Sequence, residues 1–149
     1  MGSAKRITAL FGLATPINSL ITMLQQMISV ACGGALGAIA RFLVYWSYQQ
    51  LGGKFFPLPT LIVNVLGSFF IGIAYFILVE RLQLQAAWRN GLIVGFLGAF
   101  TTFSTFSLDA FRVIQNGEPW IALSYMVGSV VLCLLATWLG FAIAQWLVE

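Results

Sequence analysis

The chain has 149 residues, of which 60% are hydrophobic and 7% charged, and its mean hydropathy is +0.97. Charged residues make up about a quarter of a typical soluble domain, so this composition excludes one. The formal net charge is only +3, and the chain contains no histidine. We therefore predict an all-α integral membrane protein.

The first 26 residues differ from the rest of the chain. A basic pair and a short apolar stretch at residues 5–14 resemble part of a signal peptide, but no clear small-x-small cleavage site follows. We interpret residues 1–26 as an N-terminal extension, either an alternative start or an added segment, in preference to a cleaved signal. Residues 27–149 then form one membrane domain.

Four stretches are long and apolar enough to cross a membrane, which takes ~20 residues of helix. They are residues 28–47, 59–79, 90–108 and 120–148. The short connections between them leave no room for a soluble domain. Aromatic residues near the ends of these stretches suit the lipid–water interface; they are Trp46, Tyr48, Trp88, Trp120 and Trp146.

Lysine and arginine are distributed almost evenly between the two predicted sides of the membrane. Arg81 and Arg89 share a side with the termini, whereas Lys54 and Arg112 lie on the other side. Membrane orientation is normally set by an excess of these residues on the cytoplasmic side. The balance predicts insertion in both orientations and hence an antiparallel homodimer, which would also help four short spans to enclose a polar path.

Residues 100–107 carry only aromatic and hydroxyl side chains. On a continuous helix, Phe100, Phe103 and Phe106 would form one stripe and the hydroxyls two further faces. Serine and threonine in membrane helices usually bond back to the i−4 carbonyl, but five in seven positions is too dense for that alone. On spacing alone, packing is the favoured interpretation of the phenylalanine stripe.

Other polar residues inside the predicted spans have two interpretations each. Asn64 is either a bond between helices or part of a polar lining. Tyr125 and Ser129 are one turn apart and share a face, which favours either a helix contact or a second polar wall. For Arg41 we favour a structural role, anchoring its span at the interface.

The residue types that the predicted spans lack indicate what kind of ion could cross the membrane through the protein. All four acidic residues lie at predicted span ends or outside the spans, so the interiors lack the titratable relay that proton coupling needs. Hydroxyl groups, an amide donor and ring edges suit a small anion. The chain offers no nucleophile–base pair, so we do not expect an enzyme. The alternatives are a small dual-topology multidrug or cation antiporter, which needs a carboxylate in its first span, and a non-conducting assembly subunit.

From about Met27 onward the chain resembles the small bacterial fluoride channels, the Fluc or CrcB family. The motif at residues 98–107, GAFTTFSTFS, carries this resemblance, supported by the glycine-rich first span ending in Arg41. The chain departs from the family pattern at Ala99 and Phe100, where glycine and leucine are common.

The resemblance implies a multi-pass protein of the bacterial plasma membrane that lets fluoride leave the cytoplasm passively. It implies a dual-topology antiparallel homodimer, a broken third helix, and a structural sodium ion held by the backbone carbonyls of Gly98 and Thr101 and not transported. The implied anion pathway consists of Asn64, Phe103, Ser104, Thr105, Phe106, Tyr125 and Ser129. The expected partners are a second copy of the chain, fluoride and membrane lipid; a nucleic-acid partner is not expected.

Overall fold

The computed structural model describes residues 17–53 and 57–148, with side chains from Ser19 onward. The first span is α2 (Ile17–Gln50), and the second is α3 (Leu58–Tyr75) followed by the π-helical segment η1 (Phe76–Arg81). The third consists of α4 (Ala86–Asn90), the π-helical segment η2 (Gly91–Leu97), α5 (Gly98–Phe100) and α6 (Phe103–Gln115), and the fourth is α7 (Pro119–Val148). The all-α class and the four spans are confirmed.

Helix α2 begins at Ile17, eleven residues before the predicted first span. Six of these eleven residues are leucine, methionine or glutamine, which are strong helix formers, and none is glycine or proline. A side-chain bond also holds this part of α2 against the third span, because Asn90 Nδ2 donates to Gln26 Oε1 at 3.1 Å. Residues 1–16 of the proposed extension lie outside the described residues.

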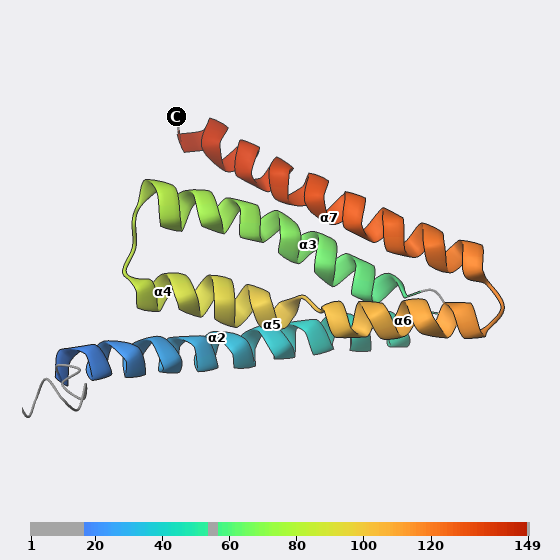
Figure 1. Cartoon of the computed structure of the whole chain (residues 1–149), viewed down its shortest axis with the longest axis horizontal. Helices are drawn as coiled ribbons and strands as arrows, with labels where there is room; N and C mark the ends of the chain where they lie inside the picture. Colours follow the sequence, from blue (N-terminus) through green and yellow to red (C-terminus); the bar gives the residue numbers. More distant parts are fainter. Residues whose placement is uncertain (1–16, 54–56, 149) are drawn as a thin grey trace, which may run out of the picture.

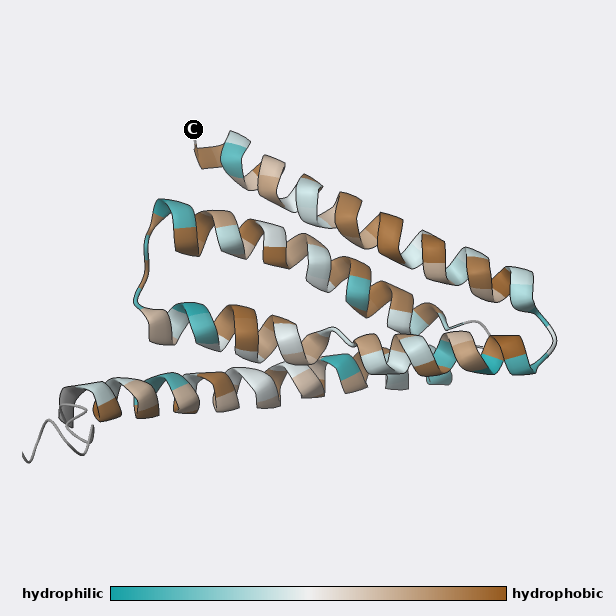
Figure 2. Ribbon diagram, viewed as in Figure 1, coloured by the Kyte–Doolittle hydropathy of each residue, from teal (hydrophilic) through white to brown (hydrophobic). Residues whose placement is uncertain are grey.

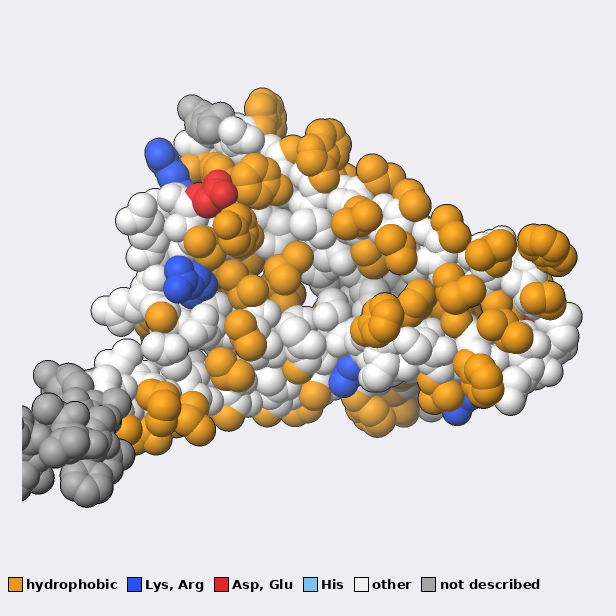
Figure 3. Space-filling view, viewed as in Figure 1, with side chains coloured by type: hydrophobic (Ala, Val, Ile, Leu, Met, Phe, Trp, Pro, Cys, Tyr) orange, Lys and Arg blue, Asp and Glu red, His pale blue; other side chains and the backbone are white. Residues whose placement is uncertain are grey.

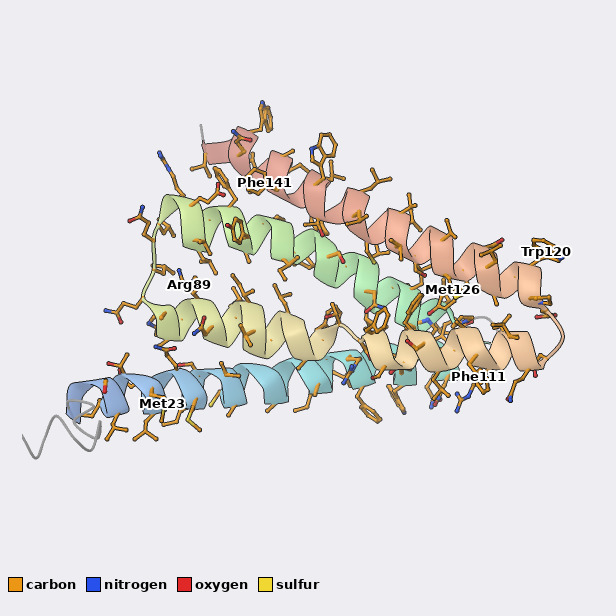
Figure 4. All side chains as sticks on the ribbon, viewed as in Figure 1. Met23, Arg89, Phe111, Trp120, Met126 and Phe141 are labelled. Atoms are coloured by element: carbon orange, nitrogen blue, oxygen red, sulfur yellow. The ribbon has the colours of Figure 1, made fainter. Side chains whose placement is uncertain are left out.

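The helices form two closely packed pairs (Figure 1). Helix α7 lies along α3, and α2 lies along α4, η2 and α5. The C-terminus, the α3–α4 connection and the start of α2 lie at one end of the molecule, while the α6–α7 turn lies at the other. Arg89, labelled in Figure 4, is therefore at the same end as the C-terminus, as the sequence predicted.

Glycines allow α2 to approach the third span closely. A Cβ at Gly33 would lie 2.0 Å from the carbonyl oxygen of Gly91, and one at Gly37 would lie 2.1 Å from that of Phe96. Real Cβ atoms do not approach so closely, so any larger residue would push the helices apart. Small residues at such spacing are typical of helix contacts in membranes.

Glycines also allow α3 and α7 to pack closely. A Cβ at Gly72 or Gly140 would lie 2.2 or 2.1 Å from a carbonyl oxygen of the facing helix. Near one end of this contact, the rings of Phe76 and Phe141 meet edge to face, with centroids 5.3 Å apart. Figure 4 shows Phe141 directed from α7 toward α3. The third span is interrupted between these two closely packed pairs, α2 with the first half of the third span and α3 with α7.

The outside of the molecule is apolar. Figure 2 shows hydrophobic residues along all four spans, and Figure 3 shows many of them on the surface. Trp138 and Leu134, both in the fourth span, are 67% exposed in the isolated chain. Such a surface is expected where lipid or another chain covers it, so the protein is a multi-pass membrane protein.

Candidate functional site

The third span is broken at Thr101 and Thr102, as the resemblance implied. Both residues have extended backbones, with φ −84° and ψ 162° at Thr101 and φ −153° and ψ 121° at Thr102. Thr102 starts the next helix, because its Oγ1 accepts a hydrogen bond from the backbone N–H of Thr105 at 3.1 Å. Threonine is a favoured residue at this capping position. The break separates α5 from α6 in the middle of the molecule (Figure 1).

Asn64 of α3 holds the backbone on one side of the break. Its Oδ1 accepts from the N–H of Thr102 at 2.8 Å, and its Nδ2 donates to the carbonyl oxygen of the same residue at 3.0 Å. Both ends of the amide are therefore used in a bond between helices. This supports one of the two interpretations of Asn64, although the side chain also borders the cavity described below.

Arg41 of α2 approaches the break from the other side. Its Nη1 donates to the carbonyl oxygen of Thr101 at 3.2 Å, and the side chain is half-buried. The sequence favours an anchoring role for Arg41 at the interface, whereas in the structure Arg41 contacts the break. The last carbonyls of a helix lack partners within the helix and form its negative end, so they attract a cationic donor.

A cavity of about 360 Å³ lies beside the break, between α3, α6 and α7. The face shown in Figure 3 is hollowed near the break. Six of the predicted site residues line the cavity: Asn64, Gly98, Thr101, Phe103, Phe106 and Ser129. The structure thus brings together residues from three spans that are up to 65 positions apart in the sequence.

The two phenylalanines of α6 form a tilted pair at the cavity. Their ring centroids are 5.4 Å apart, and Phe106 also meets the ring of Tyr125 at 5.2 Å. Phe103 is 77% exposed in the isolated chain, whereas Phe106 is buried. The expected third member of the stripe, Phe100, precedes the break and stacks on Phe96 at 6.2 Å. On a continuous helix Phe100 would share the stripe of Phe103 and Phe106, but the helix is interrupted at Thr101 and Thr102, so Phe100 is separated from the other two.

The hydroxyls of Ser104 and Thr105, two residues of the predicted pathway, lie beside the residue that caps the start of α6. Thr102 Oγ1 donates to Thr105 Oγ1 at 3.0 Å and lies 3.3 Å from Ser104 Oγ. Neither Ser104 nor Thr105 is among the residues that line the cavity. In this arrangement their hydroxyls surround the capping threonine.

Tyr125 and Ser129 share a buried face of α7, as their spacing predicted. They are 3% and 5% exposed, and Tyr125 packs with Phe106 and Ala110 in a small apolar cluster that also touches Met126 (Figure 4). The Oγ of Ser129 is buried without a hydrogen-bond partner among the described residues. A buried hydroxyl is normally paired, so this one, on a residue that borders the cavity, lacks the usual partner.

Comparison with known proteins gives the family. Residues 28–141 match the family described as CrcB-like protein, Camphor Resistance (CrcB). The chain belongs to this CrcB family. A protein of Saccharophagus degradans named fluoride-specific ion channel FluC is 47% identical over 135 residues, covering 91% of this chain and 98% of that protein. A protein of Hahella chejuensis with the same name is 45% identical over 120 residues, covering 80% of this chain and 94% of that protein. These CrcB-family relatives are named as channels, not as enzymes.

A further polar cluster of this CrcB-family chain was missed by the sequence analysis. The hydroxyl of Tyr45 lies 2.7 Å from Thr60 Oγ1, which donates to Asp109 Oδ2 at 2.5 Å. Thr60 is only 1% exposed. The cluster joins α2, α3 and α6 beside a second cavity of about 490 Å³, near the end of α2 and the start of α3.

The position of Asp109 corrects one step of the sequence argument. We placed this carboxylate at the end of the third span, but that span continues to Gln115, so Asp109 lies inside it. The sequence spacing already indicated that Asp109 belongs to α6. Asp109 follows Phe103 and Phe106 at the same spacing of three and therefore shares their face of the helix. Among the described residues the spans thus contain two carboxylates, Asp109 and, one residue before the end of the second span, Glu80. Passive conduction therefore does not follow from an absence of carboxylates.

Proposed function

We propose that this CrcB-family protein conducts fluoride passively across the bacterial plasma membrane and thereby lets fluoride leave the cytoplasm. The observation that carries the proposal is the cavity at the helix break, which Phe103, Phe106 and Ser129 line and beside which the Ser129 hydroxyl is buried without a partner among the described residues. The names of the relatives, at 40–47% identity, support fluoride as the permeant ion.

The cavity offers the two kinds of group that a small anion needs when it leaves water. Aromatic rings carry positive charge at their edges, and Phe103 and Phe106 present two rings at one point. The Ser129 hydroxyl adds a hydrogen-bond donor. One of the two N–H groups of the Asn64 amide is bound to the Thr102 carbonyl. In this proposal Asn64 therefore holds the backbone, and the rings and Ser129 contact the anion.

We further propose that two copies assemble as an antiparallel homodimer within the lipid bilayer. Phe103 borders the cavity and is 77% exposed in the isolated chain, so the cavity needs a wall that a second copy could supply. The even distribution of lysine and arginine supports insertion in both orientations. A closed symmetric dimer is the commonest way to provide such a wall.

A structural sodium ion is also part of the proposal. Gly98 and Thr101, whose carbonyls would hold it, both border the cavity at the carbonyl end of α5. The N–H of Thr102, which a continuous helix would direct at Gly98, is bonded to Asn64 instead. Hard cations prefer oxygen ligands. The Thr101 carbonyl already accepts from Arg41, so its second lone pair and the Gly98 carbonyl would hold the sodium ion, which would stabilise the broken helix in lipid.

The test separates passive conduction from exchange. Liposomes containing the protein are loaded with potassium fluoride, and release is followed with a fluoride electrode. Conduction should begin only when valinomycin lets potassium follow and dissipate the charge. Release without the ionophore would favour an antiporter, with Asp109 as the first residue to examine because α2 contains no carboxylate. No release in either case would favour the assembly subunit.

A further inference from the structure

Arg41 is a cation in the apolar part of α2. It lies nine residues before the end of the helix at Gln50, or about 14 Å along the axis. Its guanidinium donates to the carbonyl oxygen of Thr101 at 3.2 Å. Charged groups at this depth usually face a protein interior and find a partner there, and the break in the third span provides that partner.

The charge of Arg41 matches the helix end that it meets. Residues 86–100 run as one helical stretch, and Thr101 follows its last residue. The carbonyl end of such a stretch carries partial negative charge, and its final carbonyl groups have no partner within the helix. In lipid an unpaired carbonyl is costly, so a cationic donor fixed at this point stabilises the place where the helix stops.

The next residue is held from the opposite side. Asn64 binds both the N–H and the carbonyl of Thr102, and Thr102 then caps α6 through its side chain. Two consecutive residues are therefore fixed by two different helices, α2 and α3. Phe103, the exposed ring of the proposed pathway, is the first residue of α6 and directly follows this clamped pair.

We propose that Arg41 is a positioning residue: it caps the carbonyl end of the first half of the third span and thereby sets where Phe103 stands in the cavity. The effect on transport rests on the proposed function, whereas the effect on the break does not. Arg41 does not contact the anion in this proposal and acts only through the Thr101 carbonyl.

The test compares three substitutions in the full-length protein. Arg41→Met keeps the apolar stem and removes the donor, Arg41→Lys keeps a charged donor, and Arg89→Met removes a cation from the outer end of the third span as a matched control. We expect fluoride release to fall about tenfold or more in Arg41→Met, the size of a lost charge-assisted hydrogen bond. Release should stay near the original rate in Arg41→Lys and Arg89→Met. Low, non-denaturing guanidinium chloride should restore the Arg41→Met protein and change the other two little.

Hydrogen exchange at residues 101–105 provides a readout that does not depend on transport. Exchange should be faster in Arg41→Met and slow again with guanidinium, even if the original protein releases no fluoride and the proposed function is wrong. Arg41→Gln, which keeps a neutral donor, replaces Arg41→Met if that protein does not assemble. Unchanged exchange and release in Arg41→Met, or a loss that neither lysine nor guanidinium restores, would overturn the proposal.

Discussion

Replacing the two rings of the cavity separately distinguishes a site from simple packing. Phe→Ile keeps most of the apolar volume and removes the ring quadrupole, so fluoride release should fall sharply in both variants. A swap between apolar residues of similar volume costs less than about 1.5 kcal/mol. Each aromatic pair adds about 0.5–1.5 kcal/mol. Phe103 has one such partner and Phe106 has two, at 5.4 and 5.2 Å.

Stability and conduction should therefore separate in Phe103→Ile. We expect this variant to lose at most about 3 kcal/mol and Phe106→Ile up to about 4.5 kcal/mol, the upper sums of these terms. Thermal unfolding in detergent and fluoride release from liposomes measure the two effects on the same samples. Phe100→Leu is the control, because Phe100 stacks on Phe96 and does not line the cavity. Normal release by Phe103→Ile, or a loss in both variants that only follows unfolding, would refute a role of the rings in the pathway.

Three further predictions concern packing, the polar cluster and assembly. Gly37→Ala should destabilise the protein by about 1–3 kcal/mol through overpacking, whereas Gly34→Ala, whose nearest neighbour would be 4.0 Å away, should not; thermal unfolding of both checks this. Thr60→Val should cost about 1–3 kcal/mol because it leaves Asp109 without its donor, and Tyr45→Phe should cost less; equal stability of the two variants would contradict the described cluster. C-terminal tags should be labelled from both sides of the membrane and crosslinking should trap a dimer, while one-sided labelling of a monomer would remove the antiparallel arrangement.

The spans and the break differ in how far the sequence could predict them. The length of the apolar stretches was enough to predict the four spans, because a helix that crosses a membrane is defined mainly by its length and apolar composition. The break was implied by the resemblance of residues 98–107, whereas the length of the apolar stretches did not indicate it. Helical periodicity assumes an unbroken backbone, so it placed Phe100 beside Phe103, and the extended residues Thr101 and Thr102 invalidate that assumption.

The roles of Arg41 and Asn64 depend on contacts between distant parts of the chain. Arg41 binds a carbonyl 60 positions away in the sequence, and Asn64 binds backbone 38 positions away. No local sequence pattern predicts which backbone groups these side chains meet. Asp109 is different, since its spacing from Phe106 already placed it on the inner face of α6. The error there was to end the span too early, which a longer helix through Gln115 corrects.

Current through a planar bilayer tests the central claim most directly, that fluoride passes down its own gradient through this protein. With a fluoride gradient across the bilayer, the reversal potential should follow the fluoride equilibrium potential, and it should not move when a pH gradient is added. A reversal potential that follows the proton gradient, or equal currents when chloride replaces fluoride, would contradict passive and selective fluoride conduction.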